Sequence, residues 1–325
     1  MQTGRTEGHS GARRRLVIVA GPTASGKSAL ALALAQRLGG AVINADAMQC
    51  YRELRTLTAR PSFADEALVP HALYGVRAAA EPANAAWWRG AALAAIAQPY
   101  QPIICGGTGL YLSALLKGIA EIPDFDQAAR DEARQLVADL GAPALHARLQ
   151  AVDPETAGKL FPTDSQRIAR AWEVWRGTGH GLAYWQAQPT ETLTGWDVRM
   201  ILLDPPREVL RVAIAQRFAA MLEADALAEV QDLLALGLSP ALPLMRAHGV
   251  PELGAYLRGE ITLAQATAKA ILVTSQYTKR QSTWFRLQNL VDKPALHIIH
   301  ARTGDATQFS ESFLSHLINF ISLDG

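Results

Sequence analysis

The sequence is poor in the features that mark several classes of protein. Only two cysteines, Cys50 and Cys105, occur among 325 residues, which excludes a disulfide scaffold and a zinc site with four cysteine ligands. No apolar run reaches the roughly 18 residues of a membrane-spanning helix. Positive and negative charges nearly balance, because the sequence has 31 Lys and Arg and 30 Asp and Glu. Any nucleic-acid binding must therefore depend on a local concentration of positive charge.

The composition is that of a globular chain with a sizeable core, since 49% of the residues are hydrophobic and 19% are charged. The length fits one large or two modest domains. Residues 1–13 are polar and lack the apolar segment of a signal peptide. We therefore expect a cytoplasmic protein that does not associate with membranes, with flexible or peripheral tails at 1–13 and 301–325.

Apolar runs and helix-forming segments alternate along much of the chain. Strands are predicted at 16–20, 41–43, 102–105, 199–203 and 296–300, and helices at 28–38, 85–97, 110–116, 207–236 and 262–289. The alternation predicts a parallel α/β sheet. Residues 124–185 show helical patterns without a convincing strand. The predicted architecture is a sheet core at 14–121 and 197–300, interrupted by an all-helical insertion at 122–196.

A phosphate-binding loop follows the first predicted strand. The motif G-x-x-x-x-G-K-[ST] is matched by Gly21, Pro22, Thr23, Ala24, Ser25, Gly26, Lys27 and Ser28. The glycines allow the backbone to aim N–H groups at an anion, and Lys27 and the helix N-terminus add positive charge. Ser28 is a ligand for Mg²⁺ in such loops. The core is therefore predicted to be of the P-loop NTPase-like type.

The loop identifies the ligand class but leaves the reaction open between a nucleoside triphosphatase, a small-molecule kinase and a transferase with a diphosphate leaving group. An NTPase usually has an aspartate at the end of a second strand. Asp204 is one candidate, although the Pro-Pro that follows it favours a helix cap. Asp46 is another, because it follows the second strand and should face the loop, where a carboxylate can hold Mg²⁺ or accept a proton.

Several blocks, in order along the chain, resemble the bacterial tRNA dimethylallyltransferases, also called tRNA isopentenyltransferases (the IPP transferase family). The resemblance runs from about Leu16 to Leu290. After the loop, the matching blocks are Asp46-Ala47-Met48-Gln49 with Tyr51; Thr58-Ala59-Arg60-Pro61; Gly106-Gly107-Thr108-Gly109-Leu110-Tyr111; Asp164, Arg167, Arg170, Ala171, Glu173 and Val174; Gln216-Arg217-Phe218; and Lys279-Arg280-Gln281-Ser282-Thr283-Trp284-Phe285-Arg286.

The resemblance implies transfer of a dimethylallyl group from dimethylallyl diphosphate to N6 of the adenosine 3′ of the anticodon (tRNA position 37), with Mg²⁺ as cofactor. Asp46 would take up the proton of the amine. Thr23, Thr108, Arg130 and Arg217 are the other implied catalytic residues, and the phosphate loop would bind the diphosphate, with Mg²⁺ on Ser28. We expect a monomer whose macromolecular partner is the tRNA anticodon stem-loop.

The target base lies in a folded RNA loop, so it must be unstacked before it can react. The implied tRNA-binding residues are Asp46, Ala47, Met48, Gln49, Gln166, Arg167, Ile168, Ala169, Arg170, Arg246, Lys279, Arg280, Gln281, Thr283 and Arg286. Salt pairing within the insertion is the alternative for Arg167 and Arg170. Trp284 and Phe285 are expected in the core rather than against bases.

The chain departs from the family pattern at four places, which are Arg55-Thr56-Leu57, Gly75, His248-Gly249-Val250-Pro251 and Ser275. We expect retained chemistry with altered tRNA recognition. Three other functions stay open: an isopentenyltransferase acting on free adenine nucleotides, a P-loop small-molecule kinase or NTPase, and a non-catalytic tRNA-binding protein. The helical insertion and the block from Lys279 to Arg286 speak against the first of these.

Overall fold

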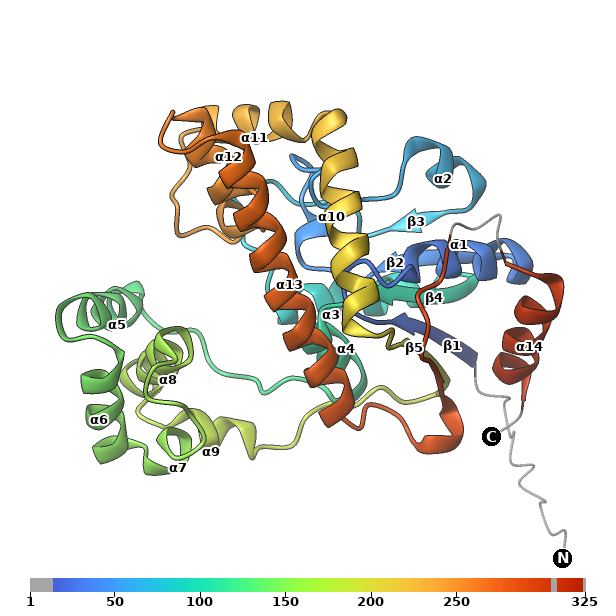
Figure 1. Ribbon diagram of the computed structural model, residues 1–325. Helices are drawn as coiled ribbons and strands as arrows, with labels where there is room; N and C mark the ends of the chain where they lie inside the picture. Colours follow the sequence, from blue (N-terminus) through green and yellow to red (C-terminus); the bar gives the residue numbers. More distant parts are fainter. Residues whose placement is uncertain (1–13, 305–308, 324–325) are drawn as a thin grey trace, which may run out of the picture. The chain divides into compact units, whose positions relative to one another are not determined.

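The computed structural model describes residues 14–304 and 309–323. The contacts between residues divide the chain into two compact units (Figure 1). The sheet unit comprises Met1–Leu116 and Leu193–Gly325, and the helical unit comprises Lys117–Thr192. The predicted bounds of the insertion, 122 and 196, lie a few residues further along the chain. The predicted leader at 1–13 lies outside the described residues.

Six parallel strands form the sheet, in the order β3-β2-β4-β1-β5-β6. They are β1 (Arg14–Ala20), β2 (Gly40–Asn44), β3 (His71–Ala72), β4 (Gln101–Gly106), β5 (Trp196–Leu203) and β6 (Leu296–Ile299). The predicted parallel α/β core is confirmed, and each predicted strand is present. The two-residue β3 was not predicted because it is too short to leave an apolar run in the sequence.

Helices of the sheet unit are α1 (Lys27–Leu38), α2 (Phe63–Leu68), α3 (Ala85–Ile96), α4 (Gly109–Lys117), α10 (Arg207–Glu223), α11 (Ala226–Ala235), α12 (Val250–Leu257), α13 (Leu263–Leu287) and α14 (Glu311–Ser322). Short 3₁₀ turns lie at Met48–Cys50, Leu244–Arg246 and Lys293–Ala295. The predicted capping box at the start of α13 is present, between Thr262 and Gln265. In the part of the chain that the structure describes, no helix is long and apolar enough to cross a membrane.

The prediction of one helix over 207–236 is wrong, because the chain leaves the helical conformation at Ala224 (φ −92°, ψ −143°). No Gly or Pro marks this break in the sequence. The bend lets Ala226 and Val230 of α11 join Phe218 and Met221 of α10 in one buried cluster. Tertiary packing therefore overrides the helix-forming composition of the segment.

The prediction of a flexible or peripheral C-terminal tail is wrong for α14. Leu314, Leu317 and Ile321 are buried in the main core, together with residues of α1 and of the strands. The apolar residues recur at a helical spacing, and Ser310 caps the helix by accepting a hydrogen bond from the backbone of Phe313. The segment is thus part of the sheet unit's core.

Both faces of the sheet are covered. Val17 and Val19 of β1 face the cluster that contains α1 and α14, while the alternate residues Leu16 and Ile18 are equally buried. Helix α3 contacts β2 and β4. Its Trp88 is fully buried and donates a hydrogen bond from Nε1 to the Asn44 carbonyl (2.7 Å). The strands are therefore fixed on both sides, which leaves their carboxyl ends as the open edge.

The helical unit has its own core. Its helices are α5 (Gln127–Leu140), α6 (Ala142–Val152), α7 (Pro154–Ala157), α8 (Ser165–Thr178) and α9 (Leu182–Gln186). Ala133, Leu145, Leu149 and Ile168 are buried without exposure and pack together. The prediction of a strand-free helical segment is confirmed for Lys117–Thr192, all of which is described.

Both cysteines should be inert in the folded protein. Cys50 and Cys105 are 0% and 2% exposed, and burial raises their pKa to about 12 and about 11. At pH 8 roughly one thiol in a thousand or fewer is then the reactive thiolate. A thiol-reactive chromophore should titrate no cysteine in the native protein and both cysteines after denaturation. Rapid native labelling of either would contradict the packing around β2 and β4.

Candidate functional site at the carboxyl edge of the sheet

Loops that follow four parallel strands meet at the carboxyl edge of the sheet. They are the phosphate loop after β1, the turn around Asp46 after β2, the Gly106-Gly107-Thr108 turn after β4, and Arg302 with Thr303 after β6. Parallel sheets bind ligands at this edge because helices cover both faces. The three sequence blocks predicted to form one site are therefore brought together.

The phosphate loop has the backbone conformation that its glycines permit. Gly26 has φ 92°, Gly21 has φ 154°, and Ala24 adopts φ 66°. Lys27 is 9% exposed, and its Nζ donates to the Pro22 carbonyl across the loop (3.4 Å). Burial lowers the pKa of Lys27, and the nearby carboxylate of Asp46 opposes that change. The ammonium group is thus held in the loop with Asp46 within electrostatic range.

A tight turn after β2 fixes Asp46. Asn44, which is fully buried, accepts from the Asp46 backbone N–H (2.8 Å) and donates to the Asp46 carbonyl (2.9 Å). The carboxylate oxygen Oδ1 of Asp46 accepts from the Met48 N–H (3.0 Å). Within residues 14–304 and 309–323, no donor is hydrogen-bonded to Oδ2. One carboxylate oxygen is therefore committed to the turn and the other is left for a substrate.

Thr108 ties the Asp46 turn to helix α13. Its Oγ1 accepts from the Ala47 N–H (3.0 Å), and its own N–H donates to the Ala45 carbonyl (3.1 Å). Tyr277 of α13 lies close enough to Thr108 to affect its pKa, which burial raises to about 12. Thr108 thus lies beside Asp46, as predicted for a residue of the same site.

Gln281 bridges the phosphate loop and the turn after β4. Its Oε1 accepts from the Thr23 N–H (2.9 Å) and from the Thr23 hydroxyl (3.2 Å), while its Nε2 donates to the Gly107 carbonyl (2.8 Å). Gly107 is required here, because a Cβ at that position would lie 2.4 Å from Nε2 of Gln281. Gln281 is 5% exposed, so its amide is an internal brace in addition to being a predicted tRNA contact.

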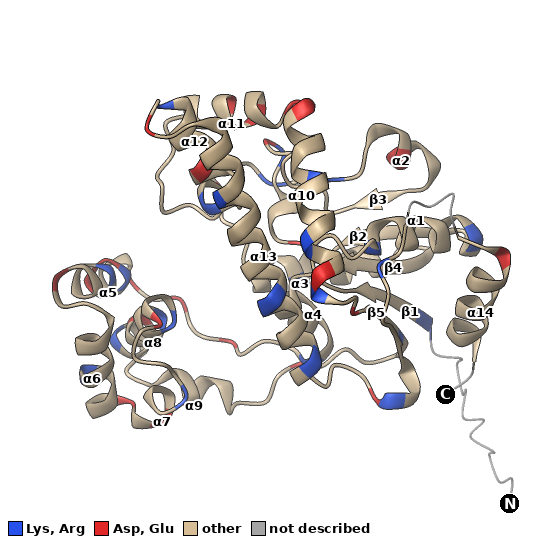
Figure 2. Cartoon of the chain, in the orientation of Figure 1, with Lys and Arg blue, Asp and Glu red and all other residues tan. Residues whose placement is uncertain are grey.

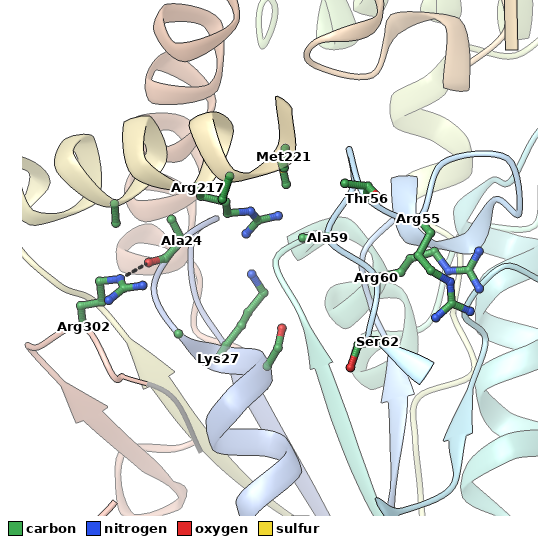
Figure 3. A pocket seen from close by; sticks show the side chains of 14 residues that line it. Ala24, Lys27, Arg55, Thr56, Ala59, Arg60, Ser62, Arg217, Met221 and Arg302 are labelled. Atoms are coloured by element: carbon green, nitrogen blue, oxygen red, sulfur yellow. Dashed lines mark hydrogen bonds between the residues drawn. The ribbon is translucent and has the colours of Figure 1, made fainter. Parts of the chain in front are cut away.

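A pocket of about 480 Å³ opens beside the loop (Figure 3). Five cationic side chains line it, and these are Lys27, Arg55, Arg60, Arg217 and Arg302. In the described part of the chain, no carboxylate forms an ion pair with Lys27, Arg217 or Arg302. Burial lowers the pKa of Arg217, and Asp46 opposes it. A pocket with this excess of positive charge is suited to a polyanion such as a diphosphate.

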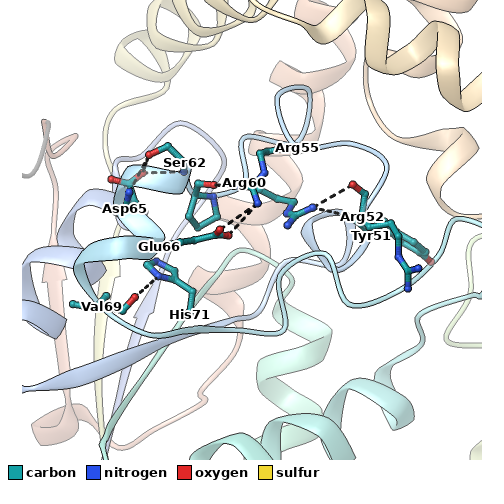
Figure 4. Close-up of polar contacts among 10 residues, drawn as sticks. Tyr51, Arg52, Arg55, Arg60, Ser62, Asp65, Glu66, Val69 and His71 are labelled. Atoms are coloured by element: carbon teal, nitrogen blue, oxygen red, sulfur yellow. Dashed lines mark hydrogen bonds and ion pairs between the residues drawn. The ribbon is translucent and has the colours of Figure 1, made fainter.

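The remaining two arginines come from the loop between the 3₁₀ turn and α2, where the chain departs from the family pattern (Figure 4). Arg55 pairs with Glu66 (3.2 Å) and stacks on Phe63. Arg60 donates to the Tyr51 and Arg52 carbonyls (3.3 Å each). These guanidinium groups are therefore largely engaged within the wall of the pocket.

The departure at Gly75 lies against the side chain of Arg60. Gly75 has φ 60°, and a Cβ there would lie 2.3–2.4 Å from the guanidinium of Arg60. The glycine at this position thus leaves room for the Arg60 guanidinium.

Glu229 of α11 holds the loop that carries these arginines. Its two carboxylate oxygens accept from three consecutive backbone N–H groups, those of Arg55 (2.9 Å), Thr56 (2.7 Å) and Leu57 (3.0 Å). Successive N–H groups that converge in this way form an anion-binding nest. The loop at 55–57 is therefore fixed by a long-range contact.

Few side chains at this site could bind a metal ion. Ser28 lines the pocket, and the described residues contain no group of three or more His, Cys, Asp or Glu that could hold an ion. Mg²⁺ commonly takes one or two protein ligands and completes its shell with phosphate oxygens and water. The residues present fit such an ion, which Ser28 would hold.

Apart from the buried Gln281, the predicted tRNA-binding residues of α13 are exposed. Lys279, Arg280 and Thr283 are exposed, whereas Phe285 is buried and Trp284 packs over Gly109, which confirms the expectation for the two aromatic residues. Gln49 differs from the exposed group, because its amide donates to the Thr58 and Ala59 carbonyls (2.9 Å each).

Asp204 does not cap a helix, so that interpretation is wrong. Helix α10 starts after Pro206 without a side-chain cap. The Asp204 carboxylate instead forms a two-pronged ion pair with Arg286 (2.9 Å for each contact). Arg286, a predicted tRNA contact, stays 62% exposed despite this partner. Asp204 is thus engaged away from the phosphate loop's cations.

The helical unit carries the other predicted RNA contacts. Arg167 pairs with Asp164 (3.4 Å) and Arg170 with Glu173 (3.2 Å), so the salt-pairing alternative is present for both. Figure 2 shows charges of both signs on α5 and α8. Such exposed pairs are weak, at about 0–1 kcal/mol, and do not prevent contact with phosphates.

The other predicted site residues of the helical unit differ in their exposure and contacts. Gln166 is exposed and Ala169 is partly buried, but Ile168 is fully buried in the unit's core, so a side-chain contact between Ile168 and RNA is excluded. Arg130 lies on α5, where it stacks on Phe125 (5.1 Å) and donates to Gln127. Arg130 thus belongs to a different unit from Asp46, Thr23, Thr108 and Arg217.

The departure at His248 places a titratable ring near the Asp46 turn. The ring packs edge-on against Tyr277 (4.9 Å between centroids), and burial lowers the pKa of His248. Val250 is buried in the helical cluster beside α13, and Arg246 is exposed. The segment is therefore ordered by packing, with Arg246 as its basic surface residue.

Sequence reasoning missed three residues of the site, which are Glu229, Tyr277 and Arg302. Glu229 and Tyr277 interact with residues more than 150 positions away along the chain. Arg302 lies in a segment that matches no motif and contacts the phosphate loop. Of these three, only Arg302 could have been predicted from the sequence, because it follows the last predicted strand and therefore lies at the carboxyl edge.

Comparisons with known proteins agree on one family. The IPP transferase model matches residues 49–288, and the isopentenyl transferase model matches residues 14–68. The chain is 57% identical over 312 residues to the tRNA dimethylallyltransferase of Granulibacter bethesdensis, covering 95% of this chain and 98% of that one. It is 60% identical over 310 residues to that of Acidiphilium cryptum, covering 95% of each.

Solved structures give the same result for the fold. The tRNA isopentenylpyrophosphate transferase from Bacillus halodurans matches with a TM-score of 0.66 and 29% identity, over 95% of this chain and 96% of that one. A eukaryotic dimethylallyltransferase acting on tRNA matches with a TM-score of 0.77 over 94% of this chain and 78% of that one. At 24% identity, this second likeness shows the fold alone.

Glu229 should stabilise the sheet unit through its three backbone contacts. Glu229→Ala leaves three N–H groups without their charged acceptor, so the free energy of unfolding should fall by about 2 kcal/mol. Asp232→Ala on the same helix removes an exposed carboxylate and should change it by less than about 0.5 kcal/mol. Urea titration followed by circular dichroism measures both, and equal effects would rule out the anchoring role.

Proposed function

Because the chain belongs to the IPP transferase family, we propose that its pocket at the carboxyl edge of the sheet binds dimethylallyl diphosphate and presents it to N6 of the adenosine 3′ of the anticodon. The chain is an enzyme that transfers a dimethylallyl group to tRNA. The observation that carries the assignment of the site is the joining of an anion-binding loop and a carboxylate with one free oxygen on the same edge.

The leaving group is the first chemical problem that the site addresses. When the bond between the allylic carbon and the diphosphate oxygen breaks, both electrons remain on the diphosphate. The loop N–H groups, Lys27 and Arg217 surround the pocket in which that charge grows. Fixed donors in a partly buried site stabilise such charge without reorganising. The Thr23 hydroxyl lies in the same loop, held by Gln281.

The nucleophile is the second problem, because an aromatic amine is a weak base. As the N6 lone pair forms the new bond to carbon, an N–H proton must leave. Asp46 Oδ2 is the acceptor we assign, since Oδ1 is committed to the Met48 N–H. Thr108 fixes the same turn through Ala47, so the carboxylate is held in one orientation. The products are the N6-substituted adenosine, diphosphate and a proton on Asp46.

Mg²⁺ is part of the proposal. Ser28 would hold it, and the ion would supply further neutralisation of the diphosphate when bound. Arg217 and Lys27 act on the same anion from the protein side. Removal of divalent ions should therefore weaken donor binding without altering the position of Asp46.

Exposed basic residues support the proposed RNA contacts. Lys279, Arg280 and Thr283 lie on α13, which also supplies Gln281 to the phosphate loop. Arg167 and Arg170 lie on α8 of the helical unit. Phosphate contacts of this type position an RNA, and the target base must leave its stack to react. We further propose that the enzyme is a cytoplasmic monomer, as expected from its substrate and its single-chain site.

The transfer assay tests the function directly. The protein is incubated with unmodified tRNA, Mg²⁺ and labelled dimethylallyl diphosphate, and the RNA is digested to nucleosides. Label should appear on the adenosine 3′ of the anticodon. Label on free adenine nucleotides but not on tRNA would favour the related isopentenyltransferase. Absence of transfer, together with phosphorylation of a small molecule by ATP, would overturn the proposal.

The role of Asp46 is tested by Asp46→Asn. Asparagine keeps an oxygen for the Met48 N–H but cannot take up the proton, so kcat for transfer should fall by about 100-fold or more while diphosphate binding is unchanged. Asp232→Asn, an exposed change on α11, is the matched control and should retain full activity. Transfer that persists in Asp46→Asn would show that another group accepts the proton.

A further inference from the structure

The segment after β6 returns to the phosphate loop and is fixed there. The Thr303 N–H donates to the Ser25 carbonyl (3.1 Å), and its hydroxyl donates to the same oxygen (3.4 Å). Thr303 is 7% exposed, and its carbonyl oxygen would lie 2.1 Å from a Cβ at Gly26. The loop and this segment therefore fit closely only because Gly26 has no side chain.

Arg302 is placed by this anchor at the wall of the pocket (Figure 3). Its Nε donates to the Ala24 carbonyl (3.0 Å), a contact that orients the guanidinium group. Within residues 14–304 and 309–323, neither of its terminal nitrogens has a hydrogen-bond partner and no carboxylate pairs with it. The two terminal nitrogens keep the planar fork that binds two oxygens of a phosphate.

Like charges gather around Arg302. Lys27 and Arg217 line the same pocket. Burial lowers the pKa of Arg217, and repulsion from the charge of Arg302 lowers it further. Arg55 and Arg60 differ, because Glu66 and two backbone carbonyls already engage them. Placing a third unpaired cation beside the loop costs free energy unless an anion offsets it.

We propose that Arg302 is a diphosphate-binding residue, delivered to the donor site by the segment that follows β6. This rests on the proposed function of the pocket. Arg302 would bind oxygens of the donor's diphosphate through its two terminal nitrogens, while its Nε keeps it on the loop. The donor site is then formed by the ends of the first and last strands of the chain together, and not by the phosphate loop and Arg217 alone.

The test uses the full chain and three variants. Arg302→Met removes the charge but keeps a long side chain, and Arg302→Lys keeps a charge. Arg258→Ala removes an arginine that pairs with the exposed Glu260. Calorimetry with inorganic diphosphate and Mg²⁺ gives the dissociation constant, and transfer kinetics give KM for each substrate. Arg302→Met should weaken diphosphate binding and raise KM for dimethylallyl diphosphate by about tenfold, with KM for tRNA unchanged.

The controls separate binding from loop structure. Arg302→Lys should recover most of the diphosphate affinity, and Arg258→Ala should match the wild type. The thermal midpoint of Arg302→Met should stay within about 2 °C of the wild type, because the side chain is exposed.

Two results would overturn the inference. One is unchanged diphosphate affinity in Arg302→Met, and the other is an equal rise in both KM values with no recovery by lysine. Failure of the wild type itself to bind diphosphate would instead contradict the proposed function of the pocket.

Discussion

Repulsion among the cations at the carboxyl edge of the sheet is the constraint on which the site depends. Lys27, Arg217 and Arg302 share one pocket, and each donates to a backbone carbonyl. Among the residues that the structure describes, no carboxylate pairs with any of the three. A carbonyl orients a cation without neutralising it. The pocket therefore keeps its positive potential for a ligand, and a chain of net charge +1 concentrates the charge that a diphosphate requires.

Braces from distant parts of the chain hold this charged edge in place. Gln281 joins the phosphate loop to the turn after β4, Thr108 joins that turn to the one around Asp46, and Glu229 fixes the loop at 55–57. Each brace satisfies backbone groups in loops that have no regular structure of their own. Groups held in this way need little rearrangement during the proposed transfer, in which charge moves from the amine to the diphosphate.

The sequence predicted the structural features that depend on neighbouring residues. The strand at 16–20, the glycines of the phosphate loop and the capping box at Thr262 each follow from a few neighbouring residues, and all are present. The break between α10 and α11 and the burial of α14 depend on apolar contacts far apart in sequence. Arg302 and Glu229 escaped prediction for the same reason, since their partners are 278 and up to 174 positions away.

A structure of the enzyme with Mg²⁺ and a thiolodiphosphate analogue of the donor tests the central claim most directly. We predict that the diphosphate lies on the phosphate loop, in contact with Lys27 and Arg217, and that the allylic carbon faces Oδ2 of Asp46. A diphosphate bound elsewhere, or an allylic group directed away from Asp46, would contradict it.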